Sequence, residues 1–287
     1  MKVLVTGATG FMGHSLLGLL SPQDELVCLV SDRRKTRPHP NVVWVEQDLG
    51  KPLDEKGIPT PIEAIIHLAQ SRYYREFPER SGDIFDVNIR STLFLLEYGR
   101  KVGIRKFIYA SSGGIYGYSY EKFIETDAIN PINFYLTSKY CAELMIGNYN
   151  SFFETVVLRF FFVYGPGQQG MLIPRLVNNI RKGEPVILYG KCGIRLNPIQ
   201  VRDAIQVFQP CLESSVRGIF NVAGEEIVSI KDLSETIASL SGKTPVFVHE
   251  GSPVSGDIVG DNSRMKSVLG VVPQISLRRG ISELIHL

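Results

Sequence analysis

Short apolar runs, separated by helix-length segments, are the feature that most limits what this chain can fold into. The runs are KVLVT at 2–6, LVCLV at 26–30, VVWVE at 42–46, AIIHLA at 64–69, KFIYAS at 106–111 and TVVLRF at 155–160. Helices are expected to begin near Phe11, Gly82 and Phe134. Strands with few polar positions that alternate with helices form a parallel sheet covered on both faces. The pattern predicts an α/β fold with a doubly wound parallel sheet over residues 1–165.

The pattern changes after residue 165. We expect helices at 172–183, at 201–215 with an interruption near Pro210, at 229–242 and near Leu277, and strands at 185–190, 218–223 and 245–250. No repeat or low-complexity linker separates this part from the first. Residues 166–287 are therefore predicted to be mainly a smaller substrate-binding lobe, with some later segments returning to the first domain.

Composition excludes several classes of protein. The 287 residues are 44% hydrophobic and 21% charged, with a net charge of +2, so neither disorder nor a nucleic-acid partner is indicated. No apolar run is long enough for a signal segment or a membrane span, which predicts no membrane partner. The cysteines and histidines form no metal-ligand spacing, so no metal site is expected. A cytoplasmic location fits the four scattered cysteines Cys28, Cys141, Cys192 and Cys211.

A glycine-rich turn follows the first predicted strand. In VLVTGATGFMG, the glycines Gly7, Gly10 and Gly13 stand between that strand and the next helix, and Phe11 and Met12 open the helix. A turn at this place brings the free N–H groups of a helix N-terminus to the pyrophosphate of a dinucleotide. The spacing predicts a dinucleotide-binding site.

The end of the second predicted strand bears on which dinucleotide is bound. Ser31 stands about where an acid would bind the ribose 2′-hydroxyl of NAD, and Asp32, Arg33 and Arg34 follow. A small residue followed by arginines favours NADP. A shift of one residue in the alignment would make Asp32 an acid of the NAD type, so the cofactor is NAD(P) with a preference for NADP.

Several motifs appear in an order that resembles the extended short-chain dehydrogenase/reductase family, which includes nucleotide-sugar epimerases, dehydratases and ketoreductases. They are TGATGFMG, QDL, HLA, VNIRST, YASSGGIYG, YLTSK, LRFFFVYGPGQ and GDI, and they cover nearly the whole chain. The resemblance implies a Rossmann-type fold and a helix-kink asparagine at Asn88. It also implies further cofactor-binding residues at Asp48, Leu49, Leu68, Ala69 and Ala110. His67 ends a predicted buried strand and is expected to be structural or to line the cofactor site.

The segment YLTSK places Tyr135 four residues before Lys139, on one face of a predicted helix. A free tyrosine with a pKa of about 10 is a poor base at neutral pH. Nearby positive charge from Lys139 and an oxidised nicotinamide should lower that pKa. The resemblance assigns Tyr135 as acid/base, Lys139 as its partner and cofactor contact, and Ser112 as the hydroxyl that binds the reacting oxygen. Ser111 is the alternative to Ser112.

The chain departs from the family pattern at three places. Gly113 and Gly114 stand where dehydratases carry an acidic pair, which argues against dehydration. Phe162 replaces the asparagine that helps hold a sugar diphosphate, and the arginine expected near GSPVS, at 251–255, is missing. Arg195, with Asn197 nearby, does resemble the other diphosphate anchor. The substrate-binding residues expected by resemblance are Ser112, Gly113, Phe162, Arg195 and Asn197.

These features predict a nucleotide-sugar epimerase that transfers a hydride at a sugar carbon. The alternative is an NADPH-dependent reductase of 4-keto nucleotide sugars. A dinucleotide-responsive binding protein without turnover is less consistent with an intact Ser112, Tyr135 and Lys139. The resemblance also implies a homodimer formed by the helices at 82–100 and 134–150.

Overall fold

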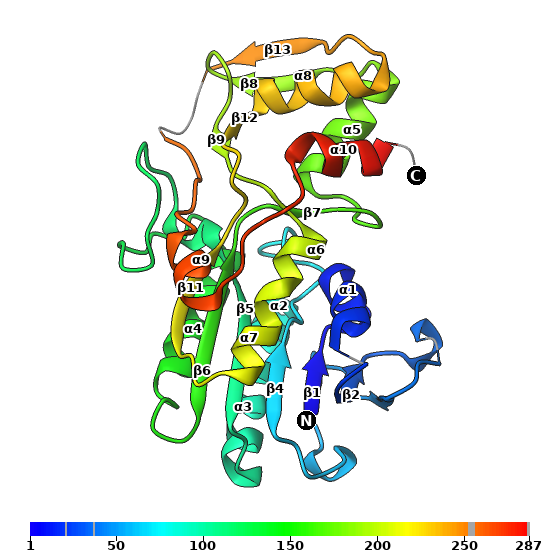
Figure 1. Cartoon of the computed structure of the whole chain (residues 1–287), viewed down its shortest axis with the longest axis vertical. Coiled ribbons are helices and arrows are strands. Elements are labelled where there is room, and N and C mark those ends of the chain that lie inside the picture. The colour runs from blue at the N-terminus through cyan, green and yellow to red at the C-terminus, as the bar shows by residue number, and fades with distance from the viewer. Residues whose placement is uncertain (21, 37, 252–255, 286–287) are drawn as a thin grey trace. The chain divides into compact units, whose positions relative to one another are not determined.

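A seven-stranded sheet combines six strands from the first 160 residues with one later strand, β11 (Figure 1). This computed structural model describes residues 1–20, 22–36, 38–251 and 256–285. The strand order is β11-β6-β5-β4-β1-β2-β3. The strands are β1 (Lys2–Thr6), β2 (Glu25–Val30), β3 (Val42–Glu46), β4 (Ala64–His67), β5 (Lys106–Ser112), β6 (Glu154–Phe160) and β11 (Gly218–Val222).

The central strands are buried and parallel. The pairs β1–β2, β1–β4, β2–β3 and β4–β5 all run parallel, and Val5 of β1 lies between Cys28 and Ile66. Every residue of β4 is buried, as are all but the first residues of β1 and β2. A strand buried on both faces needs apolar side chains at successive positions. The predicted parallel sheet is confirmed.

The chain reverses its direction of winding at β1. From β1 it proceeds to β2 and β3 on one side, and it then returns to place β4 on the other side. The loops that leave β1 and β4 at their carboxyl ends therefore diverge. Such a switch point is where open α/β sheets bind their ligands.

Two groups of helices cover the sheet. On one side α1 contacts the turn η5, and α7 contacts β5. On the other, Leu95 of α3 and Ile146 of α4 join the same core as Leu4, Val27 and Phe107 from the strands. The helical segments here are α1 (Phe11–Leu20), α2 (Ser81–Phe85), α3 (Ser91–Val102), α4 (Phe134–Gly147) and α7 (Phe208–Glu213), with the turns η1 (Arg33–Lys35), η2 (Glu55–Gly57), η3 (Asp86–Arg90), η4 (Gly113–Tyr116) and η5 (Ile205–Val207).

The chain forms two compact units with interleaved segments. The first contains Met1–Ile115, Asn130–Arg159 and Ile205–Phe220, and the second contains Tyr116–Ile129, Phe160–Ala204 and Asn221–Leu287. The first unit therefore recruits a segment from beyond residue 165. Assignment of the dinucleotide to residues 1–165 and of substrate to 166–287 stays a prediction.

The second unit has its own core. Ile173, Val177 and Ile180 line the buried face of α5 and pack with Leu233 and Ile237 of α8. A capping box between Ser229 and Asp232 begins α8. The elements of this unit are β7 (Val163–Tyr164), α5 (Leu172–Lys182), β8 (Val186–Tyr189), β9 (Arg195–Leu196), β10 (Ile199–Gln200), α6 (Val201–Ala204), β12 (Val228–Ser229), α8 (Ile230–Ser241), β13 (Phe247–Glu250), α9 (Ser263–Leu269) and α10 (Leu277–Ile285).

One predicted interruption is misplaced. The helix expected at 201–215 is divided by the turn Ile205–Val207, not at Pro210. Pro210 lies in the first turn of α7, where a backbone N–H has no partner within the helix. The proline therefore belongs to a helix start and does not break a helix.

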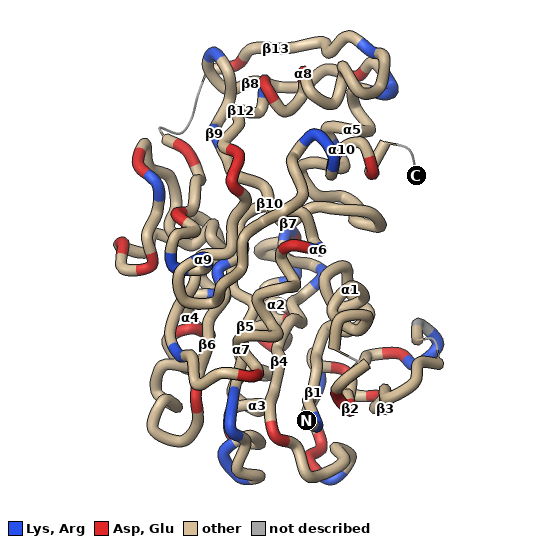
Figure 2. Tube along the Cα trace, in the orientation of Figure 1, with Lys and Arg blue, Asp and Glu red and all other residues tan. Residues whose placement is uncertain are grey.

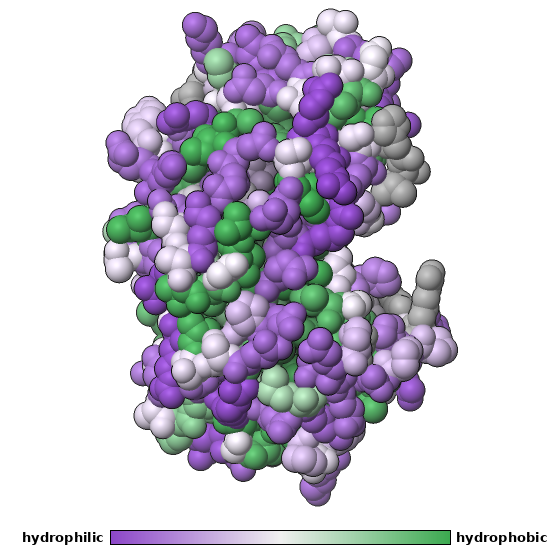
Figure 3. Space-filling model, in the orientation of Figure 1, coloured by the Kyte–Doolittle hydropathy of each residue, from purple (hydrophilic) through white to green (hydrophobic). Residues whose placement is uncertain are grey.

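The surface is polar and mixed in charge. Lys and Arg segments alternate with Asp and Glu segments along each unit (Figure 2), in keeping with the net charge of +2. On the face drawn in Figure 3, apolar and polar residues are interspersed. Within the described part of the chain, no helix is long and apolar enough to cross a membrane.

Gly13 and Gly18 of α1 offer a matched pair of substitutions. A methyl group on Gly13 would lie 2.1 Å from the carbonyl oxygen of Gly7, whereas one on Gly18 meets no atom within 4 Å. Gly13→Ala should lower the free energy of unfolding by about 2 to 3 kcal/mol. Gly18→Ala should raise it by about 0.5 to 1 kcal/mol. Urea unfolding of both variants measures this, and equal effects would contradict the close packing at Gly13.

Candidate active site

The glycine turn after β1 packs against the end of β4. Gly7 has a φ of +75°, which favours glycine, and a methyl group on it would lie 2.8 Å from the amide nitrogen of Ala69. Thr9 and Gly10 are exposed, and α1 begins directly after them with no acid in its first turn. Predicted residues Phe11 and Met12 form that first turn and are half-buried. An exposed helix N-terminus with no acid in its first turn fits a phosphate group.

The residues after β2 are arranged around Asp32. Ser31 and Arg33 are exposed. The carboxylate of Asp32 accepts hydrogen bonds from Arg34 at its backbone N (3.0 Å), Nε (2.9 Å) and Nη2 (3.0 Å). The guanidinium of Arg34 therefore already has a counter-charge within the chain.

The other predicted cofactor residues follow β3 and β4. Asp48 Oδ1 accepts from the backbone N–H of Gly50 at 3.0 Å, while its side chain stays 42% exposed. Leu49 is buried, and Leu68 and Ala69 are half-buried beside Gly7. The structure thus brings Leu68 and Ala69 to the turn after β1.

Helix α4 positions the tyrosine and the lysine. Asn133 caps the helix by accepting from the N–H of Leu136 at 2.9 Å, so Tyr135 lies in the first turn and Lys139 one turn later. Lys139 is 2% exposed, and its Nζ donates to the carbonyl of Ala110 on β5 at 2.5 Å. The same Nζ lies 4.4 Å from the ring centroid of Tyr109. This cation–π contact and the hydrogen bond fix α4 against the carboxyl end of β5.

Burial dominates the protonation of both groups. It lowers the pKa of Lys139 to about 7, and the carboxylate of Glu143 partly offsets this. Burial, with a contribution from Tyr74, raises the pKa of Tyr135 above its ordinary value. The expected lowering of the pKa of Tyr135 is therefore not produced by the groups of the chain, because the effect of burial dominates. The ammonium of Lys139 donates to Ala110.

The two serines at the end of β5 have different partners. Ser111 is buried and its hydroxyl donates to Glu143, which also accepts from Arg159 at 2.7 Å. Ser112 is half-buried, and its Oγ accepts from the N–H of Gly114 at 3.2 Å. A methyl group on Gly114 would lie 3.4 Å from Ser112 Oγ and 3.1 Å from Leu136 of α4. Ser112 is thus the serine beside the first turn of α4, and Gly113 is buried next to it.

A buried hydrogen-bonded chain connects β1, β4 and α3. The hydroxyl of Thr92 donates to the carbonyl of Asn88 at 2.7 Å, so its oxygen accepts the hydrogen of His67 Nε2 at 3.0 Å. His67 Nδ1 then accepts from the hydroxyl of Thr6 at 2.6 Å. Burial first, and then the charge of Lys139, lowers the pKa of His67 to about 3. His67 is a neutral structural link, not a base.

Asn88 extends this chain to α4. It lies 1% exposed in the π-helical turn Asp86–Arg90, which interrupts the regular helix. Its Oδ1 accepts from the N–H of Ser71 at 2.8 Å, and its Nδ2 donates to Ser138 Oγ at 2.8 Å. Ser138 donates in turn to the carbonyl of Tyr135 at 2.7 Å. Asn88 therefore holds both the segment after β4 and the first turn of α4.

Phe162 and Arg195 belong to the second unit. Phe162 has a φ of +45°, a strained conformation for an aromatic residue. Arg195 donates to Asp257 from its backbone N at 2.6 Å and from Nε at 2.7 Å, and 54% of its side chain is exposed. An exposed guanidinium held in one orientation suits an anionic group. Residues 252–255, where the family arginine was expected, lie outside the described residues.

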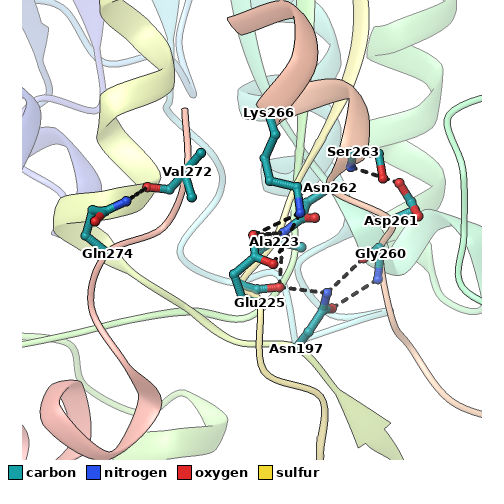
Figure 4. A network of polar contacts seen from close by, with 11 residues as sticks. Asn197, Ala223, Glu225, Gly260, Asp261, Asn262, Ser263, Lys266, Val272 and Gln274 are labelled. Carbon is teal, nitrogen blue, oxygen red and sulfur yellow. Dashed lines mark hydrogen bonds and ion pairs between the residues drawn. The ribbon is translucent and has the colours of Figure 1, made fainter. Parts of the chain in front are cut away.

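Asn197 is fully engaged with the backbone (Figure 4). Its Nδ2 donates to the carbonyls of Gly224 (3.2 Å) and Gly260 (2.8 Å), and its Oδ1 accepts from Gly260 N at 3.0 Å. Asn262 donates nearby to Ala223 O at 3.1 Å. With 3% exposure, Asn197 joins segments distant in sequence, and its proposed contact with substrate has no support from these bonds.

A surface pocket of about 410 Å³ also lies in the second unit. It is lined by the loop 167–170, by Pro174, Val177, Asn178 and Arg181 of α5, and by Leu284. None of Phe162, Arg195 and Asn197 lines it. The pocket is therefore not formed by any residue that was predicted to bind cofactor or substrate.

Three further side chains lie around the Tyr135–Lys139 pair and were not predicted from the sequence. The hydroxyl of Tyr135 donates to Gln70 Oε1 at 2.7 Å, and the ring of Tyr74 lies 5.1 Å from that of Tyr135. Gln70 follows the HLA segment directly, so a polar side chain at the end of β4 was the available signal. Glu143, four residues after Lys139, was detectable as a second charge on the same helical face.

Comparison with known proteins identifies the family. The model for the NAD dependent epimerase/dehydratase family matches residues 3–223. The chain belongs to this family. The motif resemblance to extended short-chain dehydrogenases/reductases is thereby confirmed.

Individual members of the family match over both units. dTDP-4-dehydro-6-deoxyglucose reductase of Escherichia coli is 29% identical over 307 residues, covering 99% of this chain and 96% of that protein. UDP-glucuronate 4-epimerase of Thermodesulfobacterium geofontis is 26% identical over 323 residues, covering 99% and 94%. The solved structure of MoeE5 in complex with UDP-glucuronic acid and NAD is 27% identical, with a TM-score of 0.86, covering 100% of this chain and 98% of that chain.

The buried ammonium of Lys139 should make the protein less stable than a neutral variant. Because the folded-state pKa is about 7 against an ordinary 10.5, the unfolded chain binds more protons between these values, and stability rises with pH across that window. Lys139→Met should therefore be more stable than wild type at pH 7, by about 1 to 3 kcal/mol, and the difference should shrink toward about pH 10.

Urea unfolding at both pH values measures this difference. Lys182→Met, which removes an exposed ammonium at the end of α5, is the control and should change stability by less than about 0.5 kcal/mol. A Lys139→Met variant that is less stable than wild type at pH 7 would contradict the cost we assign to burial.

Proposed function

We propose that this protein is an NAD-dependent nucleotide-sugar epimerase that inverts a hydroxyl-bearing carbon of a UDP-sugar. The observation that carries the proposal is the arrangement of α4, which holds Lys139 against Ala110 of β5 and brings its first turn, with Tyr135, close to Gly114 and Ser112. The match to MoeE5 over the full chain supports it, since that protein holds UDP-glucuronic acid and NAD. Gly113 and Gly114 carry no side chain that could move a proton, which agrees with epimerisation over dehydration.

Each residue then has a distinct task. Tyr135 would take the proton of the sugar hydroxyl and later return it, while Ser112 would donate a hydrogen bond to the same oxygen. Lys139 would keep positive charge close to the phenol and contact the nicotinamide ribose. A bound NAD supplies the acceptor and donor of hydride at the sugar carbon. Gly7, Gly10 and the first turn of α1 would hold its pyrophosphate.

NAD fits the end of β2 better than NADP. The preference for NADP rested on Arg33 and Arg34, but Arg34 is engaged by Asp32 through three hydrogen bonds. A carboxylate at this place can bind a 2′-hydroxyl and would repel a 2′-phosphate. MoeE5 holds NAD as well. We therefore propose NAD as the cofactor.

The substrate diphosphate is proposed to meet Arg195. Its guanidinium is exposed and oriented by Asp257, and arginine binds phosphate through paired N–H groups. Phe162 offers a ring where the family has an amide, so it would contact the sugar without donating a hydrogen bond. This difference would favour substrates that carry a less polar group where the sugar contacts Phe162.

A homodimer remains our proposal for the assembled enzyme. Leu93 of α3 is 45% exposed and Leu144 of α4 is 54% exposed, and these two helices contact one another. Apolar side chains on adjacent helices would be buried by a second copy. A cytoplasmic location is likewise retained as a proposal.

The second candidate function is reduction of a 4-keto nucleotide sugar. It is favoured by the 29% identity to dTDP-4-dehydro-6-deoxyglucose reductase of Escherichia coli. The same tyrosine would then donate a proton to the carbonyl oxygen. The two functions differ in the fate of the cofactor, because an epimerase regenerates NAD and a reductase consumes reduced cofactor.

Product analysis separates the candidates. Incubated with NAD and either UDP-glucose or UDP-glucuronic acid, the enzyme should form the 4-epimer, reach the same ratio from either epimer, and cause no net change in reduced-nicotinamide absorbance. Stoichiometric oxidation of NADPH or NADH with a 4-keto nucleotide sugar, and no epimer, would identify a reductase instead.

Tyr135→Phe tests the assigned acid/base. Loss of the phenolic oxygen should lower kcat about 10²- to 10⁴-fold, since a positioned acid/base contributes that much, while the Kd for NAD changes less than about twofold. Steady-state kinetics and a binding titration measure the two quantities. Tyr140→Phe, five residues along the same helix, is the control and should retain turnover. A Tyr135→Phe enzyme with near-normal kcat would refute the assignment.

A further inference from the structure

Gln70 is the hydrogen-bond partner of the phenol that we assign as acid/base. The hydroxyl of Tyr135 donates to Gln70 Oε1 at 2.7 Å. Gln70 is exposed and Tyr135 is half-buried, whereas Lys139 is buried and donates to Ala110. The hydrogen bond at the phenol is therefore made by an exposed side chain, while the ammonium one turn along α4 is in the interior.

The backbone on both sides of Gln70 is anchored to buried groups. The N–H of Ala69 donates to Thr6 Oγ1 at 3.3 Å, and the N–H of Ser71 donates to Asn88 Oδ1 at 2.8 Å. Thr6 and Asn88 are 0% and 1% exposed. An exposed glutamine in a free loop would not have its neighbours fixed in this way. The position of Gln70 is set by the core of the first unit.

Asn88 anchors the two ends of the hydrogen bond together. From one amide it accepts the N–H of Ser71, next to Gln70, and donates to Ser138, which binds the carbonyl of Tyr135. The side chain of Asn88 thus fixes the positions of Gln70 and Tyr135 relative to each other. Their contact follows from the fold of the unit and not from a chance meeting of two surface groups.

The ring of Tyr135 is also restrained from the side. The ring of Tyr74, four residues after Gln70, lies 5.1 Å from it at an interplanar angle of 55°. The guanidinium of Arg75 lies 5.1 Å from the centroid of Tyr74. The segment after β4 therefore supplies both a ring against the phenol and an amide at its hydroxyl.

A primary amide is suited to this position because it is uncharged at every working pH. In this structure its oxygen accepts the hydrogen bond from the phenol. Accepting from the phenol favours the protonated form. A side chain with no polar atom should therefore release the proton more readily, and a carboxylate should retain it more strongly.

We propose that Gln70 is a further residue of the proton-transfer site, which orients the hydroxyl of Tyr135 and holds its proton in place. The inference rests on the proposed role of Tyr135. Other titratable groups around the phenol are Tyr74 after β4, Tyr109 on β5 and Lys139 on α4. Substitution of Gln70 leaves all three in place.

Two near-isosteric variants, Gln70→Met and Gln70→Glu, test the inference by shifts of opposite sign. In the complex with NAD, phenolate absorbance is titrated for each variant and corrected by the same variant carrying Tyr135→Phe. The titration midpoint should fall by about one pH unit in Gln70→Met and rise by about one to two in Gln70→Glu. In a plot of kcat against pH, the acid limb should move in the same direction as the midpoint for each variant.

Gln23→Met and Gln23→Glu are the matched controls, because Gln23 is exposed in the turn between α1 and β2. Neither should shift the midpoint. If Gln70 had a purely structural role, both Gln70 variants would change the protein in the same way. Midpoint shifts of equal sign, or no shift, would therefore overturn the inference.

The titration does not depend on turnover, and this separates the two proposals. Opposite shifts combined with a fully active Tyr135→Phe enzyme would support the coupling of Gln70 to the phenol and remove the proposed function. An inactive Tyr135→Phe enzyme without those shifts would overturn the role of Gln70 alone.

Discussion

The buried ammonium of Lys139 is the constraint on which the site depends. Placing a charge where only 2% of the residue is exposed is costly, so the surrounding groups have to compensate for lost water. The carbonyl of Ala110 and the ring of Tyr109 do so from β5, and Glu143 does so electrostatically from the next turn of α4. These contacts bring α4 to the carboxyl end of β5. The first turn of α4, which contains Tyr135, lies near Gly114 and Ser112 as a consequence of satisfying that charge.

A second constraint links this helix to the glycine turn. The neutral chain from Thr6 through His67 and Thr92 to Asn88 lies between β1, β4 and α3, and Asn88 then reaches Ser138 on α4. Because each member is buried and has a defined donor or acceptor role, breaking one link leaves an unpaired polar group. The π-helical turn at Asp86–Arg90 directs Asn88 to this task. This chain of hydrogen bonds therefore fixes the relative positions of the proposed cofactor turn and the proposed acid/base.

Local patterns in the sequence were sufficient for the sheet and for α1, α4, α5 and α8, because burial on both faces of a strand or one face of a helix leaves a direct mark on hydrophobic spacing. The same reasoning found the glycine turn and the Tyr135–Lys139 pair. It misplaced the break near Pro210, since a proline is compatible with the start of a helix as well as its end. It could not find the bond between Gln70 and Tyr135 or the commitment of Asn197 to Gly260, because both partners are far apart in sequence and meet only in the fold.

The protonation of Tyr135 joins these constraints to chemistry. Burial raises the pKa of the phenol, and Gln70 accepts its hydrogen, so the chain by itself favours the neutral acid. Lys139 does little to lower the pKa of Tyr135 at neutral pH, because burial brings the pKa of Lys139 itself to about 7 and its charge is then only partly present. Glu143, which is hydrogen-bonded to Arg159 and Ser111, raises the pKa of Lys139 and so helps to keep its positive charge. A phenolate at this site therefore requires positive charge beyond what the chain provides, and under the proposed function proton transfer from Tyr135 would be coupled to the binding of the oxidised cofactor.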